Sequence, residues 1–173
     1  MQIIQVAGYS NTGKTRLIEA LCANLPHPVI VVKFSHHPPS DRPGSDTSRF
    51  ATQQADTFLF QPGQMTWRGS APLAIDWKST AHYYRWMIWE GGKHLPTPKI
   101  VLDSQQILDQ LVNVRLVIGP HEVTTPGTDY YKAELPLNLA AIQEVAAYIV
   151  EHQLQLSFCW KDPSASEFFQ GSL

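Results

Sequence analysis

Eight residues, from Gly8 to Thr15, follow the pattern glycine, four free positions, glycine, lysine and a hydroxyl residue. The apolar run Gln2 to Ala7 precedes them, and apolar residues recur at helical spacing from Leu17 to Leu25 after them. A phosphate-binding loop requires this order of strand, loop and helix, whereas a chance match does not. The motif therefore predicts an α/β unit that holds phosphate at the end of its first strand.

Each fixed position of the loop has a chemical reason. Glycine allows tight curvature and lets backbone N–H groups approach phosphate oxygens closely. Lys14 then reaches the β- and γ-phosphates, and the Thr15 hydroxyl binds Mg²⁺. We predict that this segment binds a nucleoside triphosphate with Mg²⁺ through its glycines and the residues around them, namely Gly8, Ser10, Asn11, Thr12, Gly13, Lys14, Thr15 and Arg16.

The rest of the chain alternates strand-like and helix-like segments. Apolar runs predict strands at Val29 to Phe34, Thr57 to Phe60, Trp86 to Trp89, Lys99 to Leu102 and Val112 to Ile118, with Gln64 to Arg68 as a hairpin partner. Helices are expected around residues 47–55 and 76–84, and the spacing of Leu139 to His152 predicts a third. The pattern indicates a three-layer P-loop NTPase fold, with a largely parallel sheet flanked by helices. We expect one nucleotide-binding domain over residues 1–156 and an irregular tail over 157–173.

Composition disfavours several other classes of protein. The chain has 13 Lys and Arg against 15 Asp and Glu, a formal charge of -2, so no overall field attracts nucleic acid. No apolar run approaches the roughly 20 residues that a bilayer span needs, and no leader-like segment precedes the first strand. We therefore expect a cytoplasmic protein without nucleic-acid or membrane partners, in which Cys22 and Cys159 are reduced thiols.

P-loop proteins usually hold Mg²⁺ partly through an acid at the end of another strand. Glu90 directly follows the apolar run Trp86 to Trp89 and is the predicted second metal residue, acting with Lys14 and Thr15; the alternative is a solvated carboxylate. Lys33 closes another strand and is a candidate phosphate contact. In the polar loop that follows, Asp41 is a candidate metal ligand, and Asp46 and Arg49 are candidate nucleotide contacts, although surface loops are commonly acidic.

These residues together resemble the molybdopterin-guanine dinucleotide biosynthesis protein B (MobB) family of GTP-binding proteins. The resemblance spans most of the chain and depends on the order of its motifs, which are Gly8 to Thr15, Lys33 with His36-His37, Asp41, Gly44 to Arg49, Glu90 to Lys93, Pro98 to Ile100 and Leu135 to Asn138. It implies a homodimer that binds GTP and Mg²⁺, hydrolyses GTP slowly, and assists a nucleotidyltransferase that attaches GMP to molybdopterin.

The chain departs from the family pattern at three positions. Phe34 stands where the family commonly has histidine, Ser45 where lysine is expected, and Gly92 where an aromatic residue is expected. Loss of a cation beside Asp46 weakens the expectation that this loop binds a molybdopterin phosphate.

Two other functions fit the same phosphate loop. A small-molecule kinase or ATPase would use the loop around Asp41 and Asp46 as its acceptor site, with Asp41 as the base. A scaffold without catalysis would order its loops when the γ-phosphate is present. Since the chain has no evident base-reading sequence of the form Asn-Lys-x-Asp, the choice of guanine depends on the resemblance alone.

Overall fold

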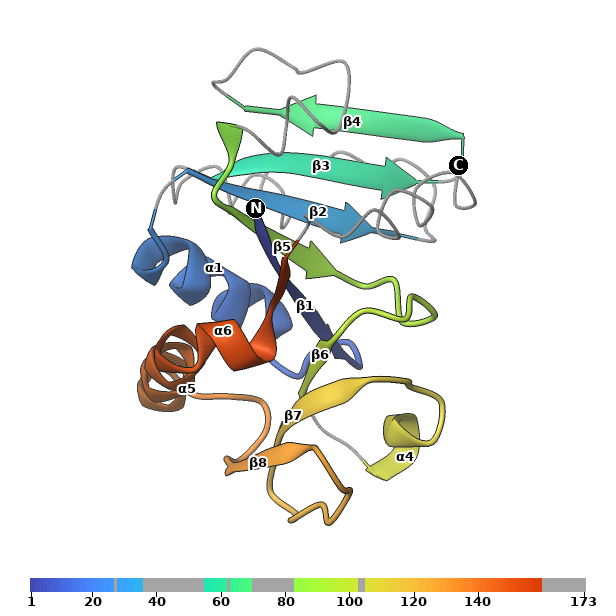
Figure 1. Cartoon of the computed structure of the whole chain (residues 1–173), viewed down its shortest axis with the longest axis vertical. Helices are drawn as coiled ribbons and strands as arrows, with labels where there is room; N and C mark the ends of the chain where they lie inside the picture. The colour runs from blue at the N-terminus through green and yellow to red at the C-terminus, as the bar shows by residue number, and fades with distance from the viewer. Residues whose placement is uncertain (27, 36–54, 62, 70–82, 103–104, 160–173) are drawn as a thin grey trace.

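The fold is built on a nine-stranded sheet with helices on both of its faces (Figure 1). It was analysed in a computed structural model, which describes residues 1–26, 28–35, 55–61, 63–69, 83–102 and 105–159. The strands run in the order β4-β3-β2-β5-β1-β6-β7-β8, and β9 pairs with β1. Their bounds are β1 Gln2–Gly8, β2 Val29–Phe34, β3 Asp56–Gln61, β4 Gln64–Arg68, β5 Trp86–Glu90, β6 Lys99–Leu102, β7 Val114–Gly119, β8 Asp129–Lys132 and β9 Phe158–Cys159.

Most strand pairs are parallel. Among the described strands, β4 runs antiparallel to β3 and β9 runs antiparallel to β1. Strand β1 occupies the centre, where β5 pairs along one edge and β6 pairs with residues 5–8 along the other. A parallel strand covered on both faces is apolar throughout. This explains why β1 and β5 are mainly apolar instead of alternating, with Gln5 in β1 as a buried polar exception. The observed pairing confirms the predicted largely parallel sheet.

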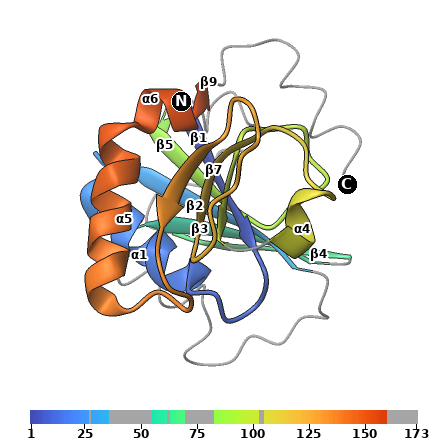
Figure 2. The same ribbon diagram turned by 90° about the horizontal axis from the view of Figure 1, so that it is seen from below.

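Helices α1 (Lys14–Asn24) and α5 (Leu139–Glu151) cover one face, and the short α4 (Gln105–Leu108) lies on the other (Figure 2). Ile4 and Val6 of β1 belong to the core cluster that α1 and α5 complete, whereas Ala7 packs with Ile107 of α4. The Asn138 side chain caps α5 by accepting a hydrogen bond from the N–H of Ala141 at 2.9 Å. The predicted three-layer α/β fold is therefore present.

Four short elements were not predicted. They are α4, α6 (Gln153–Leu156), β8 and β9. The edge strand β8 has no fully buried residue, so its sequence has no apolar run to reveal it. Strand β9 lies within residues 157–173, which were expected to be irregular. Its two residues form a strand because they pair with Gln2 and Ile3 of β1. The helices expected around 47–55 and 76–84 fall mainly outside the described residues.

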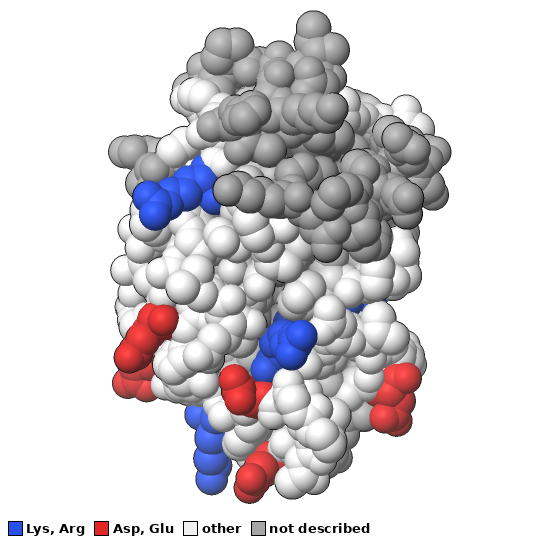
Figure 3. Space-filling view, viewed as in Figure 1, with Lys and Arg blue, Asp and Glu red and all other residues white. Residues whose placement is uncertain are grey.

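Charged side chains of the described residues are scattered over the face drawn in Figure 3, with both signs interspersed. Within the described part of the chain, no helix is both long enough and apolar enough to cross a membrane. Both cysteines are free thiols, as predicted. Burial, with a smaller contribution from Glu19, raises the pKa of the Cys22 thiol to about 12, so this cysteine remains protonated at neutral pH.

A buried glutamine fixes the start of the connection between β5 and β6. Gln5 is fully buried, and its amide nitrogen donates to the carbonyl oxygens of Gly91 at 2.6 Å and Gly92 at 2.8 Å. Its amide oxygen accepts a hydrogen bond from the Thr97 hydroxyl. Because these bonds satisfy the buried amide, Gln5 ties the chain that follows Glu90 to the central strand.

A buried lysine fixes the end of the same connection. Lys99 is fully buried, and its ammonium group donates to the carbonyl oxygens of Leu95, of Thr97 at 2.9 Å and of Val112 at 3.1 Å. Burial lowers the pKa of Lys99 to about 8. Lys99 therefore joins residues 95–97 to the segment that precedes β7, away from solvent.

Replacement of this lysine gives a test of its role. Lys99→Met should lower the free energy of unfolding by about 2 kcal/mol or more at pH 7, because three carbonyl oxygens lose their donor. Between a folded pKa of about 8 and the ordinary value of 10.5, the unfolded chain holds the proton that the folded chain has released. Wild-type stability should therefore rise with pH in this window, and its difference from Lys99→Met should grow.

Denaturant titrations at several pH values measure this difference, with Lys93→Met as the control because Lys93 is exposed on the same connection. The control should show no such growth. A constant difference for Lys99→Met across the window would contradict the assignment.

Candidate functional site

The phosphate loop predicted from Gly8 to Thr15 leaves the carboxyl end of β1 and leads directly into α1. Three of its residues have positive φ angles: Gly8 at 145°, Asn11 at 64° and Gly13 at 100°. The Thr12 hydroxyl donates to the carbonyl oxygen of Tyr9 at 3.0 Å, which closes the turn. The Lys14 ammonium donates to the same carbonyl oxygen, so its side chain lies back across the loop.

Two glycines of the loop are required by close neighbours. A Cβ atom at Gly8 would lie 2.5 Å from the carbonyl oxygen of Leu102, which no side chain tolerates. A Cβ atom at Gly13 would lie 3.3 Å from the backbone nitrogen of Leu137, in the connection that leads to α5. The loop is therefore held between β6 on one side and the start of α5 on the other.

The first turn of α1 is suited to an anion. Gly13 is the N-terminal capping residue, so no side chain satisfies the first N–H groups, and this turn contains no acidic residue. Unsatisfied N–H groups and the positive end of the helix dipole favour negative charge at this position. Lys14 adds a full positive charge, and Thr15 and Arg16 lie in the same turn.

Glu90 and Lys33 form an ion pair beside the phosphate loop. Glu90 is the last residue of β5, where it is in register with Val6 of β1 and with Lys33 of β2. The Lys33 ammonium lies 3.3 Å from a carboxylate oxygen of Glu90, and the two side chains are 19% and 10% exposed respectively. Since Ile88 and Val31 face α1, the alternation along each strand puts Glu90 and Lys33 on that same face.

The structure thus brings together most of the predicted site. The residues from Gly8 to Arg16 form one loop and helix start, and Glu90 and Lys33 follow at the same edge of the sheet. The remaining candidates, Asp41, Asp46 and Arg49, lie outside the described residues, so their predicted contacts stay predictions.

The donors at this edge fit a magnesium ion that binds together with phosphate. Thr15 would offer a hydroxyl oxygen and Glu90 a carboxylate oxygen, which are the hard oxygen ligands that Mg²⁺ prefers. Among the described residues, no three His, Cys, Asp or Glu side chains gather closely enough to hold a metal by themselves. The other oxygens would come from phosphate and water, as is usual for magnesium in phosphate sites.

Residues that support the site were missed in the sequence. Gln5 anchors the chain after Glu90, and the Lys93 ammonium lies 5.0 Å from the centre of the Tyr9 ring, which connects that chain to the phosphate loop. Leu137 packs against Gly13. Gln5 had a signal of its own, since an amide within a buried apolar strand needs internal partners.

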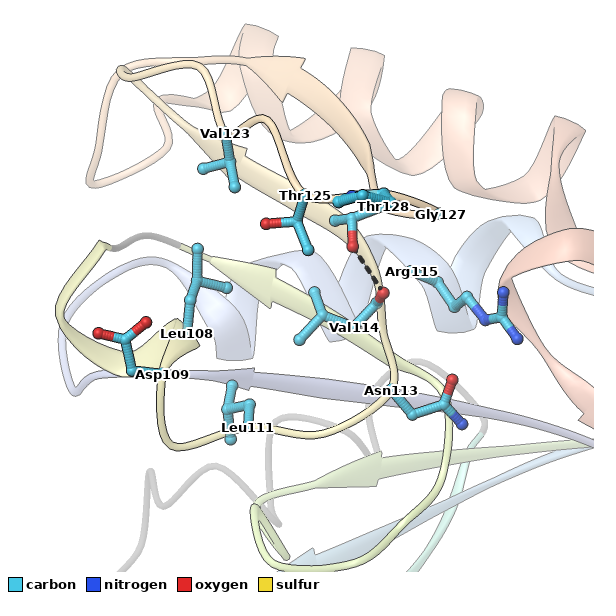
Figure 4. A pocket seen from close by; sticks show the side chains of 11 residues that line it. Leu108, Asp109, Leu111, Asn113, Val114, Arg115, Val123, Thr125, Gly127 and Thr128 are labelled. Atoms are coloured by element: carbon cyan, nitrogen blue, oxygen red, sulfur yellow. Dashed lines mark hydrogen bonds between the residues drawn. The ribbon is translucent and has the colours of Figure 1, made fainter.

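The hollow drawn in Figure 4 lies where β7 and β8 begin, at the amino end of these strands. It has a volume of about 380 Å³ and is bordered by the chain after α4 and by residues 123–128. Val114 begins β7 there, and its carbonyl oxygen accepts a hydrogen bond from Thr128 at 3.0 Å. Since the phosphate loop follows the carboxyl end of β1, this hollow is separate from the predicted phosphate site.

The sequence matches a family model described as "MobB: Molybdopterin guanine dinucleotide synthesis protein B" over residues 3–118, a range that contains the phosphate loop, Lys33 and Glu90. No curated protein matches the sequence. Similar solved structures include a crystal structure of molybdopterin-guanine biosynthesis protein B, with 18% identity, coverage of 86% of this chain and 97% of that chain, and a TM-score of 0.48. A MobB homolog from Bacillus stearothermophilus has 24% identity, coverage of 87% and 96%, and a TM-score of 0.49. Bacillus subtilis MobB has 22% identity, coverage of 85% and 97%, and a TM-score of 0.48.

A methyl group at Gly8 tests the packing of the loop. Gly8→Ala should lower the free energy of unfolding by more than about 2 kcal/mol, because the new Cβ meets a backbone oxygen that cannot move without disturbing β6. Gly63→Ala is the matched control, since Gly63 also has a positive φ angle, 72°, but has nothing within 4 Å of the added Cβ. The control should cost about 1 kcal/mol, from the backbone conformation alone. Equal losses in thermal or denaturant unfolding would contradict the steric argument.

Proposed function

Because the chain belongs to the molybdopterin guanine dinucleotide synthesis protein B family, we propose that it binds GTP with Mg²⁺ at the phosphate loop and hydrolyses it slowly. The family acts in the synthesis of molybdopterin guanine dinucleotide, and this is the process in which the chain takes part. In the proposal, the bound nucleotide controls how the chain assists the nucleotidyltransferase that attaches GMP to molybdopterin.

One observation carries the nucleotide proposal. The phosphate loop follows β1, and Glu90 ends the adjacent strand β5 on the face that α1 covers. In open parallel sheets, ligands bind beyond the carboxyl ends of the strands. A loop with N–H donors and a lysine, together with a carboxylate on the next strand, supports a triphosphate that binds with a divalent cation.

Each residue has a specific part in this proposal. Lys14 would leave the Tyr9 carbonyl oxygen and bind the β- and γ-phosphates, while the N–H groups from Gly8 to Thr15 would orient the phosphate chain. Thr15 and Glu90 would hold Mg²⁺, which supplies positive charge to the phosphate oxygens. Asp41, Asp46 and Arg49 remain predicted contacts to the metal or nucleotide.

Guanine preference and assembly are the finer parts of the proposal. The guanine dinucleotide in the family's description supports GTP over ATP. We extend the proposal to a cytoplasmic homodimer, which family membership supports, and to a nucleotidyltransferase as its partner. Molybdopterin is a second candidate ligand, although Ser45 removes a cation that the family pattern would supply.

Calorimetric titration of the full chain with GTP and with ATP, each with and without Mg²⁺, tests the ligand. We expect GTP to bind at least about tenfold more tightly than ATP. Binding should also weaken when Mg²⁺ is removed, because Thr15 and Glu90 then lose their shared ion. A preference for ATP would contradict the guanine assignment and would favour a small-molecule kinase or ATPase.

Removal of the loop lysine tests the site itself. Lys14→Ala should weaken GTP binding by at least about 100-fold, because a charge that contacts phosphate is lost. The melting temperature should change little, since this lysine is only partly buried. Arg115→Ala removes an exposed cation near the opposite edge of the sheet and should leave GTP affinity unchanged. Retained affinity in Lys14→Ala would exclude the phosphate loop as the binding site.

A further inference from the structure

The Glu90 carboxylate has two possible positive partners, the Lys33 ammonium group and a divalent metal ion. Glu90 ends β5 and Lys33 is its registered neighbour on β2. Their charged atoms are 3.3 Å apart, and neither side chain is more than 19% exposed. The carboxylate that the proposed function assigns to Mg²⁺ is therefore already bound to a positive charge of the protein.

This arrangement has an electrostatic cause. A carboxylate that is largely removed from water is costly unless a positive charge compensates it. Lys33 supplies that charge in the absence of ligand. A divalent cation at the same carboxylate would stand close to the ammonium group, and two positive charges at such a separation repel strongly where water is largely excluded.

We propose that Lys33 is a built-in counter-ion, which holds the Glu90 carboxylate until a divalent cation and a phosphate group arrive together. The inference rests on the proposed function, since it takes Glu90 as a metal residue of the nucleotide site. In it, the cation replaces the ammonium group at Glu90, and the ammonium group turns to a phosphate oxygen. Lysine suits this exchange because its charge ends a flexible stem.

The exchange makes metal and nucleotide depend on each other. Metal alone must displace the Lys33 ammonium group from Glu90 and brings no anion for it, so metal alone binds weakly. A triphosphate supplies that acceptor, so metal and triphosphate bind with positive coupling. Lys33 is therefore a positioning residue that makes Glu90 select a metal that accompanies phosphate over a free metal ion.

The test uses Mn²⁺ alone, followed by electron paramagnetic resonance, on the full-length protein without nucleotide. Lys33→Met should tighten Mn²⁺ binding by at least about fivefold, because the competing charge is gone. Lys33→Arg should restore weak binding, and Glu90→Gln in the Lys33→Met background should abolish the gain. If Lys33→Met does not fold, Lys33→Gln serves in its place.

Lys132→Met is the control for the general field of the protein. Lys132 is exposed at the end of β8, away from the ion pair. Removal of this charge should leave Mn²⁺ affinity within about twofold, since the ion pair at Glu90 stays intact. Equal gains in Lys132→Met and Lys33→Met would overturn the proposal. So would unchanged or weaker Mn²⁺ binding in folded Lys33→Met.

GTP titration of the same variants separates this inference from the proposed function. The coupling between Mn²⁺ and GTP, measured as the fold-change in GTP affinity on adding the metal, should shrink at least about threefold in Lys33→Met. One outcome would overturn the counter-ion role and leave the proposed function intact. In it, GTP binding requires Lys14, but Mn²⁺ binding and its coupling to GTP are unaltered in Lys33→Met. Tighter Mn²⁺ binding in Lys33→Met without any GTP binding would contradict the proposed function and keep only the competition between Lys33 and the metal at Glu90.

Discussion

The close approach of Gly8 to the carbonyl oxygen of Leu102 determines where the phosphate loop leaves the sheet. This contact forms because β6 pairs in parallel with the last residues of β1, so Gly8 and Leu102 are in register. An added Cβ atom would lie 2.5 Å from that oxygen. The chain can turn from β1 into α1 only where a side chain is absent. The helix start, its N–H groups and Lys14 all take their positions from this turn.

Buried polar side chains concentrate around the connection between β5 and β6. Gln5 holds its beginning and Lys99 holds its end, each through hydrogen bonds to backbone carbonyl oxygens. In an apolar core, such bonds satisfy groups that would otherwise be costly to bury. Their effect is to fix the two ends of the chain between Glu90 and Lys99. The carboxylate thus stands at a defined place beside the phosphate loop, even though an irregular segment follows it.

Sequence patterns predicted the elements that are long, apolar and buried. The strands β1, β2, β5, β6 and β7 and the helices α1 and α5 were recovered because burial on both faces, or on one stripe, leaves a clear period. Strand β8 is exposed at the edge, and β9 has two residues, so neither has such a signal. The loop between β1 and α1 was predictable for a different reason, since its residues are contiguous in sequence and their pattern restricts the residue types.

The amino-acid sequence by itself determined the phosphate loop, the parallel α/β architecture and Glu90 as a strand-end carboxylate, because each depends on local spacing and residue type. Only the tertiary structure decided what surrounds them. The partnership of Lys33 with Glu90 depends on β2 and β5 being neighbours in register, and these strands are far apart in the sequence. The contact of Leu137 with Gly13 likewise depends on how α5 packs against α1. Strand order and register arise from the burial of the whole sheet, which no local segment encodes.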